Sequence, residues 1–311
     1  MEKRTTTQPM EVVLIANEKG GVGKTTTTLN LANCLTAFGY KVLVLDMDPS
    51  ANLSAAALQN DPALSLYDVF DGRVSLPEVL VDTPFGYVAP SIKVLPGLDG
   101  EMSAPNSKSL TQIANRLLGV RGGEYMLSAH LRKSSKYNLE EYFDFVLIDS
   151  APSDNILILN SIVAADSVIV PVELSASAVN GLQMFLGSIA TARDYYRTNV
   201  GFDGMLVVKY AEDTSSDRTM AKIIDQLCQQ FQIPRYATKI RYSATMRSAM
   251  DTCRPILDFI SNGHGAVDSL NMTLEFLRKR NLTPLTDFPG IQTQPDGNLV
   301  YIRPTKAKKE G

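Results

Sequence analysis

Short apolar runs alternate with longer stretches of helical periodicity along most of the chain. Buried strands are predicted at residues 12–16, 41–45, 92–96, 143–148, 167–172 and 205–209, which are rich in apolar and β-branched residues. Helices are predicted at residues 25–38, 65–70, 110–118, 156–165, 177–196, 216–231 and 266–280. Strands that alternate with helices need right-handed crossovers. We therefore expect an α/β fold with a doubly wound, mostly parallel sheet and helices on both faces.

The same pattern divides the chain into three parts. Residues 1–10 are a polar lead-in, residues 11–281 carry the alternating elements, and residues 282–311 contain scattered prolines. We expect one domain over residues 11–281 and an extended C-terminal tail over residues 282–311. A chain of 311 residues can bury the large core that such a domain needs.

A glycine-rich segment follows the first predicted strand and opens the first predicted helix. It consists of Lys19, Gly20, Gly21, Val22, Gly23, Lys24, Thr25 and Thr26. Glycines let backbone N–H groups approach a phosphate closely, and the helix N-terminus adds a favourable dipole. Lys24 can reach the β- and γ-phosphates, and the Thr25 hydroxyl can bind Mg²⁺. Glu18 replaces the first glycine of the plain P-loop motif, and Lys19 is an additional lysine.

Carboxylates follow two further predicted strands. Asp46 and Asp48 come directly after residues 41–45, although aspartates before a proline can also mark a simple turn. Asp149 ends the apolar run of residues 143–148, which is the Walker B arrangement, and it would hold Mg²⁺. Because the carboxyl ends of parallel strands share one edge of the sheet, these carboxylates are expected beside the glycine-rich segment.

Together these segments resemble the deviant Walker A ATPases of the ParA/MinD group, over about residues 11–281. In that family the extra lysine, matched by Lys19, reaches across a nucleotide-sandwich dimer to the partner's phosphates. Asp48 matches the carboxylate that positions or activates the attacking water, and Asp46 matches one that supports the Mg²⁺ and P-loop lysine shell. The chain departs from the family pattern at two positions, where Ser50 replaces a glutamine and Ala151 a proline.

The resemblance implies an ATPase that uses ATP and Mg²⁺, with Lys19, Lys24 and Asp48 as its catalytic residues. It also implies an ATP-dependent homodimer that binds non-specific DNA and partitions plasmid or chromosomal DNA with a ParB-like centromere-binding partner. Only about ten residues precede the first predicted strand, so we expect no N-terminal helix-turn-helix domain.

Composition narrows these expectations. The net charge of −3 excludes a globally basic nucleic-acid coat but permits a local basic patch. Cys34, Cys228 and Cys253 lie far apart, which argues against a disulfide framework or a structural zinc site. No apolar run is long enough to span a membrane, and the start has no secretory apolar segment. We therefore expect a cytoplasmic protein that does not use a membrane.

One stretch has an unusual charge pattern. Residues 232–250 contain no acidic residue and four basic ones, namely Arg235, Lys239, Arg241 and Arg247. The stretch is either an ordinary solvated surface or a strip that binds DNA phosphates, because like charges on one face give sequence-independent affinity. The family resemblance favours the second interpretation.

Three alternatives share parts of this pattern. A relative that positions another intracellular cargo would carry identical motifs, and only genomic neighbours or a partner pull-down would separate it. A MinD-like membrane switch needs a C-terminal amphipathic helix, whereas the tail has prolines and no apolar stripe. A redox enzyme like the nitrogenase iron protein needs cluster cysteines, which the three cysteines do not match.

Overall fold

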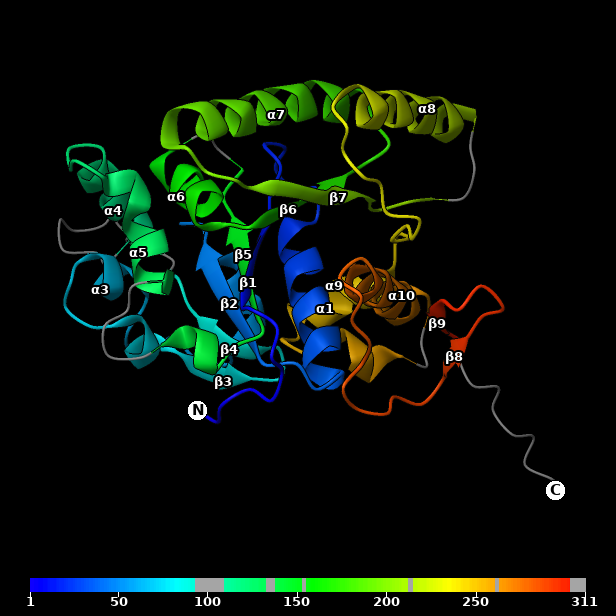
Figure 1. Ribbon diagram of the computed structural model, residues 1–311, viewed down its shortest axis with the longest axis horizontal. Helices are drawn as coiled ribbons and strands as arrows, with labels where there is room; N and C mark the ends of the chain where they lie inside the picture. The colour runs from blue at the N-terminus through cyan, green and yellow to red at the C-terminus, as the bar shows by residue number, and fades with distance from the viewer. Residues whose placement is uncertain (93–108, 133–137, 153–154, 212–214, 261–262, 303–311) are drawn as a thin grey trace, which may run out of the picture.

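A seven-stranded sheet forms the centre of the computed structural model, which describes residues 1–92, 109–132, 138–152, 155–211, 215–260 and 263–302 (Figure 1). The strand order is β3-β4-β2-β5-β1-β6-β7, and every neighbouring pair is parallel except β3 and β4. The strands are β1 (Glu11–Ile15), β2 (Val42–Met47), β3 (Val81–Thr83), β4 (Gly86–Ala89), β5 (Phe145–Ser150), β6 (Ser167–Val172) and β7 (Gly201–Val207). The predicted doubly wound, mostly parallel sheet is therefore confirmed.

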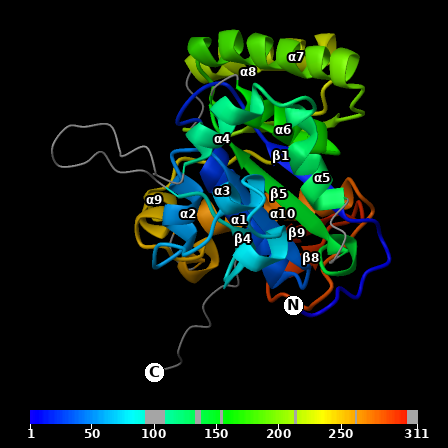
Figure 2. The same ribbon diagram turned by 90° about the vertical axis from the view of Figure 1, so that its left-hand side faces the viewer.

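Helices cover both faces of this sheet, because its central strands are apolar on both sides. Val12 and Leu14 face one hydrophobic core, whereas Val13 and Ile15 face the other. The first core is covered by α3 (Leu66–Phe70), α4 (Leu110–Leu117), α5 (Met126–Arg132), α6 (Ile156–Ala164), α7 (Ala176–Tyr196) and α8 (Ser215–Gln230). The second core is covered by α1 (Lys24–Ala37), α2 (Asn52–Ala57), α9 (Ala244–Asp251) and α10 (Gly265–Arg278) (Figures 1 and 2).

The helix after the glycine-rich segment is buried along most of its length. It ends at Ala37, one residue before the cap Phe38. Gly39 then adopts φ +91°, which a residue with a Cβ rarely adopts, and its N–H bonds the Thr36 carbonyl. The predicted glycine stop of this helix is confirmed.

The C-terminal segment is not extended as the sequence suggested. Residues 291–301 form an antiparallel hairpin of β8 (Ile291–Thr293) and β9 (Leu299–Tyr301). Tyr301 packs against Phe288, whose ring lies 5.4 Å from that of Phe38 after α1. The proline-based prediction is wrong over these residues because apolar side chains at both ends of an Asp-Gly turn dock on the domain.

Several smaller predictions have different outcomes. The strand expected at residues 92–96 falls almost wholly outside the described residues, as do residues 303–311 of the tail. The short helices α2 and α9, the edge strand β3 and its neighbour β4 were not predicted. The helix α2 and the two strands have six residues or fewer, which is too few for a clear periodicity. No helix within the described ranges is both long and apolar enough to cross a membrane.

Candidate functional site

The glycine-rich segment curls around open space at the carboxyl end of β1, the strand between β5 and β6. Buried Asn17 fixes its start, since its amide donates to the Pro171 carbonyl at 2.7 Å and its oxygen accepts from Lys19 N–H at 3.0 Å. Gly21 and Gly23 adopt φ +70° and +94°, which favour glycine. A Cβ added at exposed Gly20 or Gly21 would meet nothing within 4 Å, so this part of the loop borders free space.

Lys24 lies inside this loop and is only 6% exposed. Its ammonium donates to the Asn17 carbonyl at 3.0 Å and to the Lys19 carbonyl at 3.1 Å. Burial lowers the pKa of Lys24, whereas the nearby carboxylates of Asp149 and Asp48 act in the opposite direction. A cation held at the centre of a loop of backbone N–H groups is suited to bind a polyphosphate.

Asp149 and Thr25 meet beside the first turn of α1. The Thr25 hydroxyl donates to Asp149 Oδ2 at 2.6 Å, whereas buried Asp149 Oδ1 has no hydrogen-bond partner among the described residues. Burial and then the carboxylate of Asp46 on the neighbouring strand raise the pKa of Asp149 well above its ordinary value. An unpartnered carboxylate oxygen beside a threonine hydroxyl fits a hard cation such as Mg²⁺.

Asp46 and Asp48 have different environments although they are two residues apart. Fully buried Asp46 accepts the backbone N–H and hydroxyl of Ser54 at 2.8 and 2.6 Å, and burial raises its pKa to about 6. Partly exposed Asp48 accepts the Ser50 N–H at 2.8 Å in a tight turn. Asp46 therefore anchors the loop after β2, while Asp48 is carried toward the site by that loop.

Lys19 does not point at its own loop. Its ammonium lies 2.8 Å from Glu173 Oε2 and 3.2 Å from Ser175 Oγ, in the turn between β6 and α7. Glu173 was not among the predicted site residues, although an acidic residue directly after a predicted strand was a signal that could have found it. β1 and β6 are neighbours in the sheet, so their carboxyl ends bring these two side chains together.

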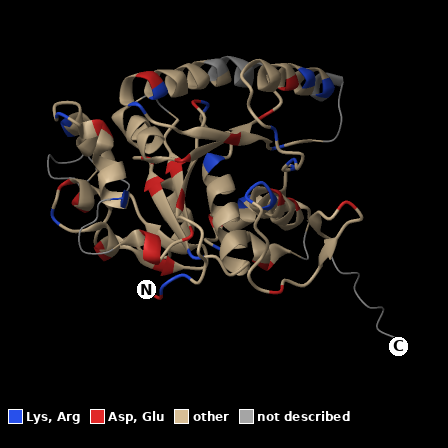
Figure 3. Cartoon of the chain, in the orientation of Figure 1, with Lys and Arg blue, Asp and Glu red and all other residues tan. Residues whose placement is uncertain are grey.

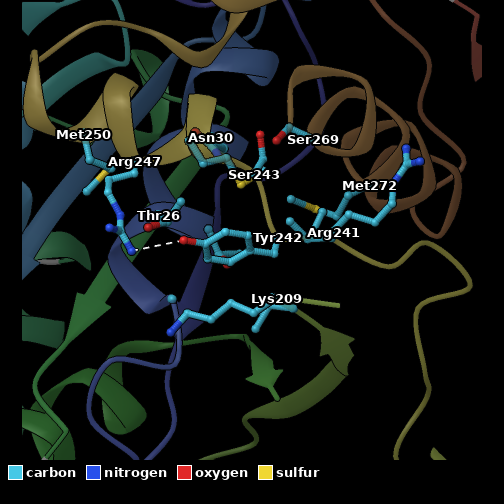
Figure 4. Close-up of a pocket in the computed structure, with 15 residues that line it drawn as sticks. Thr26, Asn30, Lys209, Arg241, Tyr242, Ser243, Arg247, Met250, Ser269 and Met272 are labelled. Carbon is cyan, nitrogen blue, oxygen red and sulfur yellow. Dashed lines mark hydrogen bonds between the residues drawn. The ribbon is translucent and has the colours of Figure 1, made fainter. Parts of the chain in front are cut away.

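A cavity of about 300 Å³ opens beside Gly23 and the first turns of α1 (Figure 4). Most of its wall is apolar, with a few polar side chains among them, and it includes Val208, Ile240, Met246, Asn30, Ser243 and Ser269. At one side Arg247 donates to the Tyr242 hydroxyl at 3.1 Å. An apolar cavity with a few polar groups, next to a phosphate loop, suits a flat heterocyclic base.

Three of the four basic residues of the predicted strip, Arg235, Lys239 and Arg241, lie on a segment that runs along the outer edge of β7, whereas Arg247 lies on α9. Tyr236 and Ile240 turn into the core, so Arg235, Lys239 and Arg241 turn outward. The strip is partly neutralised by acidic residues from other helices. Arg235 pairs with Asp225 of α8, and Arg241 forms two bonds to Asp268 of α10.

The remaining two cations of the strip have aromatic partners. The Lys239 ammonium lies 4.3 Å from the centre of the Tyr210 ring, and exposed Arg247 contacts the Tyr242 hydroxyl. Figure 3 shows acidic residues interspersed with basic ones over much of the described chain, so this segment is not part of a uniformly basic face.

Comparisons with known proteins agree with this geometry. A family model described as an AAA domain matches residues 10–202. The chromosome partitioning protein ParA of Caulobacter vibrioides is 33% identical over 216 residues, which cover 69% of this chain and 75% of that protein.

Two solved structures extend the comparison. Cobyrinic acid a,c-diamide synthase from Mycobacterium smegmatis, with bound ADP and magnesium, has a TM-score of 0.63 at 27% identity, over 82% of this chain and 97% of that one. An ATP complex of a McdA variant from Cyanothece has a TM-score of 0.72, over 89% and 99% of the two chains, and its 21% identity supports the fold alone. The chain belongs to the ParA-type, deviant Walker A family of P-loop ATPases, and its cofactors are ATP and Mg²⁺.

Proposed function

We propose that the protein dimerises around ATP, binds non-specific DNA in that state and partitions plasmid or chromosomal DNA with a ParB-like centromere-binding partner. The observation that carries the proposal is the extra lysine of the phosphate loop, Lys19, in a chain 33% identical to a chromosome partitioning ATPase. In its ATP-bound form the protein would associate with the nucleoid.

The phosphate loop supplies the binding chemistry. Backbone N–H groups from Gly20 to Thr26 surround the phosphates, and the buried ammonium of Lys24 turns from the loop carbonyls toward them. Thr25 and the Asp149 oxygen that has no partner within the described ranges would hold Mg²⁺, which would neutralise charge on the phosphates. The base occupies the cavity between α1, the end of β7 and α9.

Asp48 orients the attacking water, because it is the one of the three aspartates Asp46, Asp48 and Asp149 that keeps some exposure to solvent. Asp46 has a structural role, since its oxygens accept hydrogen bonds from the N–H and hydroxyl of Ser54 and from the Asp48 N–H at 3.2 Å. This anchoring fixes where the loop that carries Asp48 begins. Ser50, which replaces the family's glutamine, keeps the turn through its backbone N–H.

Lys19 contributes to the site of a second subunit. In a dimer that faces two nucleotides toward each other, the lysine stabilises charge on the partner's phosphates, as an arginine finger does. Without it, two polyphosphates would meet across a partly desolvated gap with their charges uncompensated. Each subunit would therefore need the Lys19 of the other.

DNA contact is proposed for the segment along β7 and for Arg247 on the adjoining α9. Within the described ranges Lys239 and Arg247 have aromatic partners and no acidic one, so they are the stronger candidates for phosphate contacts. Arg235 and Arg241 would contribute less, because Asp225 and Asp268 already neutralise them. Dimerisation doubles these contacts and makes the DNA interaction bivalent.

The test uses Lys19→Ala and light scattering with a non-hydrolysed ATP analogue. We expect monomer nucleotide affinity to remain, while dimerisation, hydrolysis and binding to random-sequence duplex all disappear together. The matched control is Lys41→Ala, which removes a partly exposed lysine paired with Glu2 at the other end of the sheet. A Lys19→Ala protein that dimerises and hydrolyses ATP like the parent would reduce the chain to a generic P-loop ATPase. A parent protein that dimerises but does not bind DNA would favour the alternative function, the positioning of another intracellular cargo.

A further inference from the structure

Glu173 is shared by two lysines that come from different strands. Lys19 Nζ lies 2.8 Å from one carboxylate oxygen, and Lys209 Nζ lies 2.7 Å from the other. The side chains of Lys19, Glu173 and Lys209 are 25%, 22% and 45% exposed. Although partial burial acts in the opposite direction, the two ammonium groups hold the pKa of Glu173 below its ordinary value.

Topology explains why these three charges meet. β1, β6 and β7 are consecutive in the sheet, and all three point the same way. Lys19, Glu173 and Lys209 each follow the carboxyl end of one of them. Lys209 adopts φ +52°, an uncommon conformation for a residue with a side chain, and its ammonium also bonds the Gly21 carbonyl at 2.5 Å.

The charge balance of the cluster is unequal, with two cations and one anion. If Lys19 leaves Glu173, the carboxylate keeps Lys209 as its partner and no partly buried charge is left unpaired. If Lys209 were absent, the departure of Lys19 would leave the partly buried carboxylate without a cation, which is unfavourable. Lys209 therefore lowers the free energy needed to release Lys19.

We propose that Glu173 is a latch that holds Lys19 in the lone subunit, and that Lys209 is the substitute cation that lets Lys19 transfer to the partner's phosphates. Glu173 and Lys209 are positioning residues here, because both act through Lys19. The latch rests on the proposed function of Lys19 in the dimer. It sets how readily a nucleotide-loaded subunit dimerises, separately from how tightly that subunit binds nucleotide.

The test measures the dimer dissociation constant by sedimentation at a saturating concentration of a non-hydrolysed ATP analogue. Saturation removes any effect of the variants on nucleotide affinity. Glu173→Gln keeps the shape of the side chain but removes its charge, and we expect it to lower the dissociation constant roughly threefold to tenfold for two latches. Lys209→Met should raise the constant by a similar factor, because Glu173 then has Lys19 as its one cation.

The double variant separates the latch from general structural damage. If Lys209 acts through Glu173, adding Lys209→Met to Glu173→Gln changes nothing further, and the pair of variants is strongly non-additive. An unchanged or weaker Glu173→Gln dimer, or a Lys209→Met effect that persists without the Glu173 charge, overturns the latch. Lys19→Ala in the same assay is the reference, since a normal dimer there would refute the proposed function itself.

Discussion

Asp46 and Asp149 are paired in register on neighbouring strands, so two buried carboxylates lie close together beneath the phosphate loop. Burial penalises the charged form of each, and the charge of Asp46 further disfavours the charged form of Asp149. Asp46 is compensated by three hydrogen bonds, whereas one oxygen of Asp149 has no partner among the described residues. The pair is therefore arranged to give Asp46 a supporting role and to leave Asp149 for a cation.

The stability of the protein should depend on the charge of Asp46. Its pKa is raised from 3.8 to about 6 on folding, so the folded state binds the proton more tightly. The free energy of unfolding should therefore rise as the pH falls from about 6 to 4, by on the order of 1.4 kcal/mol per unit of pKa difference. In urea titrations, the free energy of unfolding of the parent minus that of Asp46→Asn should increase as the pH falls from about 6 to 4. Asp82→Asn, at an exposed carboxylate, is the control. A difference between parent and Asp46→Asn that does not change with pH would contradict a raised pKa for Asp46.

Asp48 should matter for turnover and not for nucleotide binding. Replacing it by alanine removes the carboxylate that orients water, so we expect ATP and Mg²⁺ to bind while hydrolysis falls roughly 100-fold or more. Calorimetry and phosphate release measure the two quantities. Ser50→Ala is the matched control, since its backbone N–H and the turn are retained. Parental turnover in Asp48→Ala would assign water activation to another residue.

At the level of single residues, sequence reasoning located the groups that belong to contiguous motifs. The glycine-rich segment and the aspartates at the carboxyl ends of β2 and β5 lie where the alternation of strands and helices predicts. Glu173 and Lys209 were not assigned to the site. The position of Glu173 directly after a predicted strand was a local signal, but its contacts with Lys19 and Lys209 depend on strands that are neighbours in the sheet and far apart in the chain.

Among the larger elements, the hairpin β8–β9 shows how a proline-rich segment can still be structural. Asn271 of α10 bonds both backbone groups of Tyr301, accepting its N–H at 2.7 Å and donating to its carbonyl at 3.4 Å. Phe288 joins the hairpin to the end of α1. The sequence indicated turns but not the surface on which the segment docks, so the extended prediction followed from composition alone.

Removing the Tyr301 side chain should weaken the whole domain. The residue is 4% exposed, and truncation of a buried aromatic side chain costs about 3 kcal/mol. We expect Tyr301→Ala to lower the free energy of unfolding by that amount in urea titrations. Gln292→Ala on the exposed side of β8 should change it by less than about 0.5 kcal/mol. Equal stability of both variants would mean that the hairpin does not support the domain.

Residues 232–250, after α8, show that tertiary contacts also change the charge that a segment presents. Their sequence has no acidic residue, yet Asp225 and Asp268 reach them from α8 and α10. A count of charges along the chain therefore overestimates the field of the folded surface. The side chains of Arg235, Lys239 and Arg241 point outward because these residues alternate with buried Tyr236 and Ile240. This alternation can be interpreted only once the segment is known to lie along β7.

At the scale of the whole molecule, nucleotide, dimer and DNA should be linked. If the ATP-bound dimer presents two copies of the basic strip (Arg235, Lys239, Arg241 and Arg247) to one duplex, its DNA affinity exceeds that of the monomer. Thermodynamic reciprocity then requires DNA to strengthen dimerisation by the same factor. We expect random-sequence duplex to lower the dimer dissociation constant, measured with a non-hydrolysed ATP analogue at low salt. The double variant Lys239→Ala/Arg247→Ala should reduce both factors together and decrease the salt slope by about 0.9 for each DNA phosphate that is no longer neutralised. Lys41→Ala should change neither, and equal DNA affinity with and without the analogue would break the proposed link between dimer and DNA.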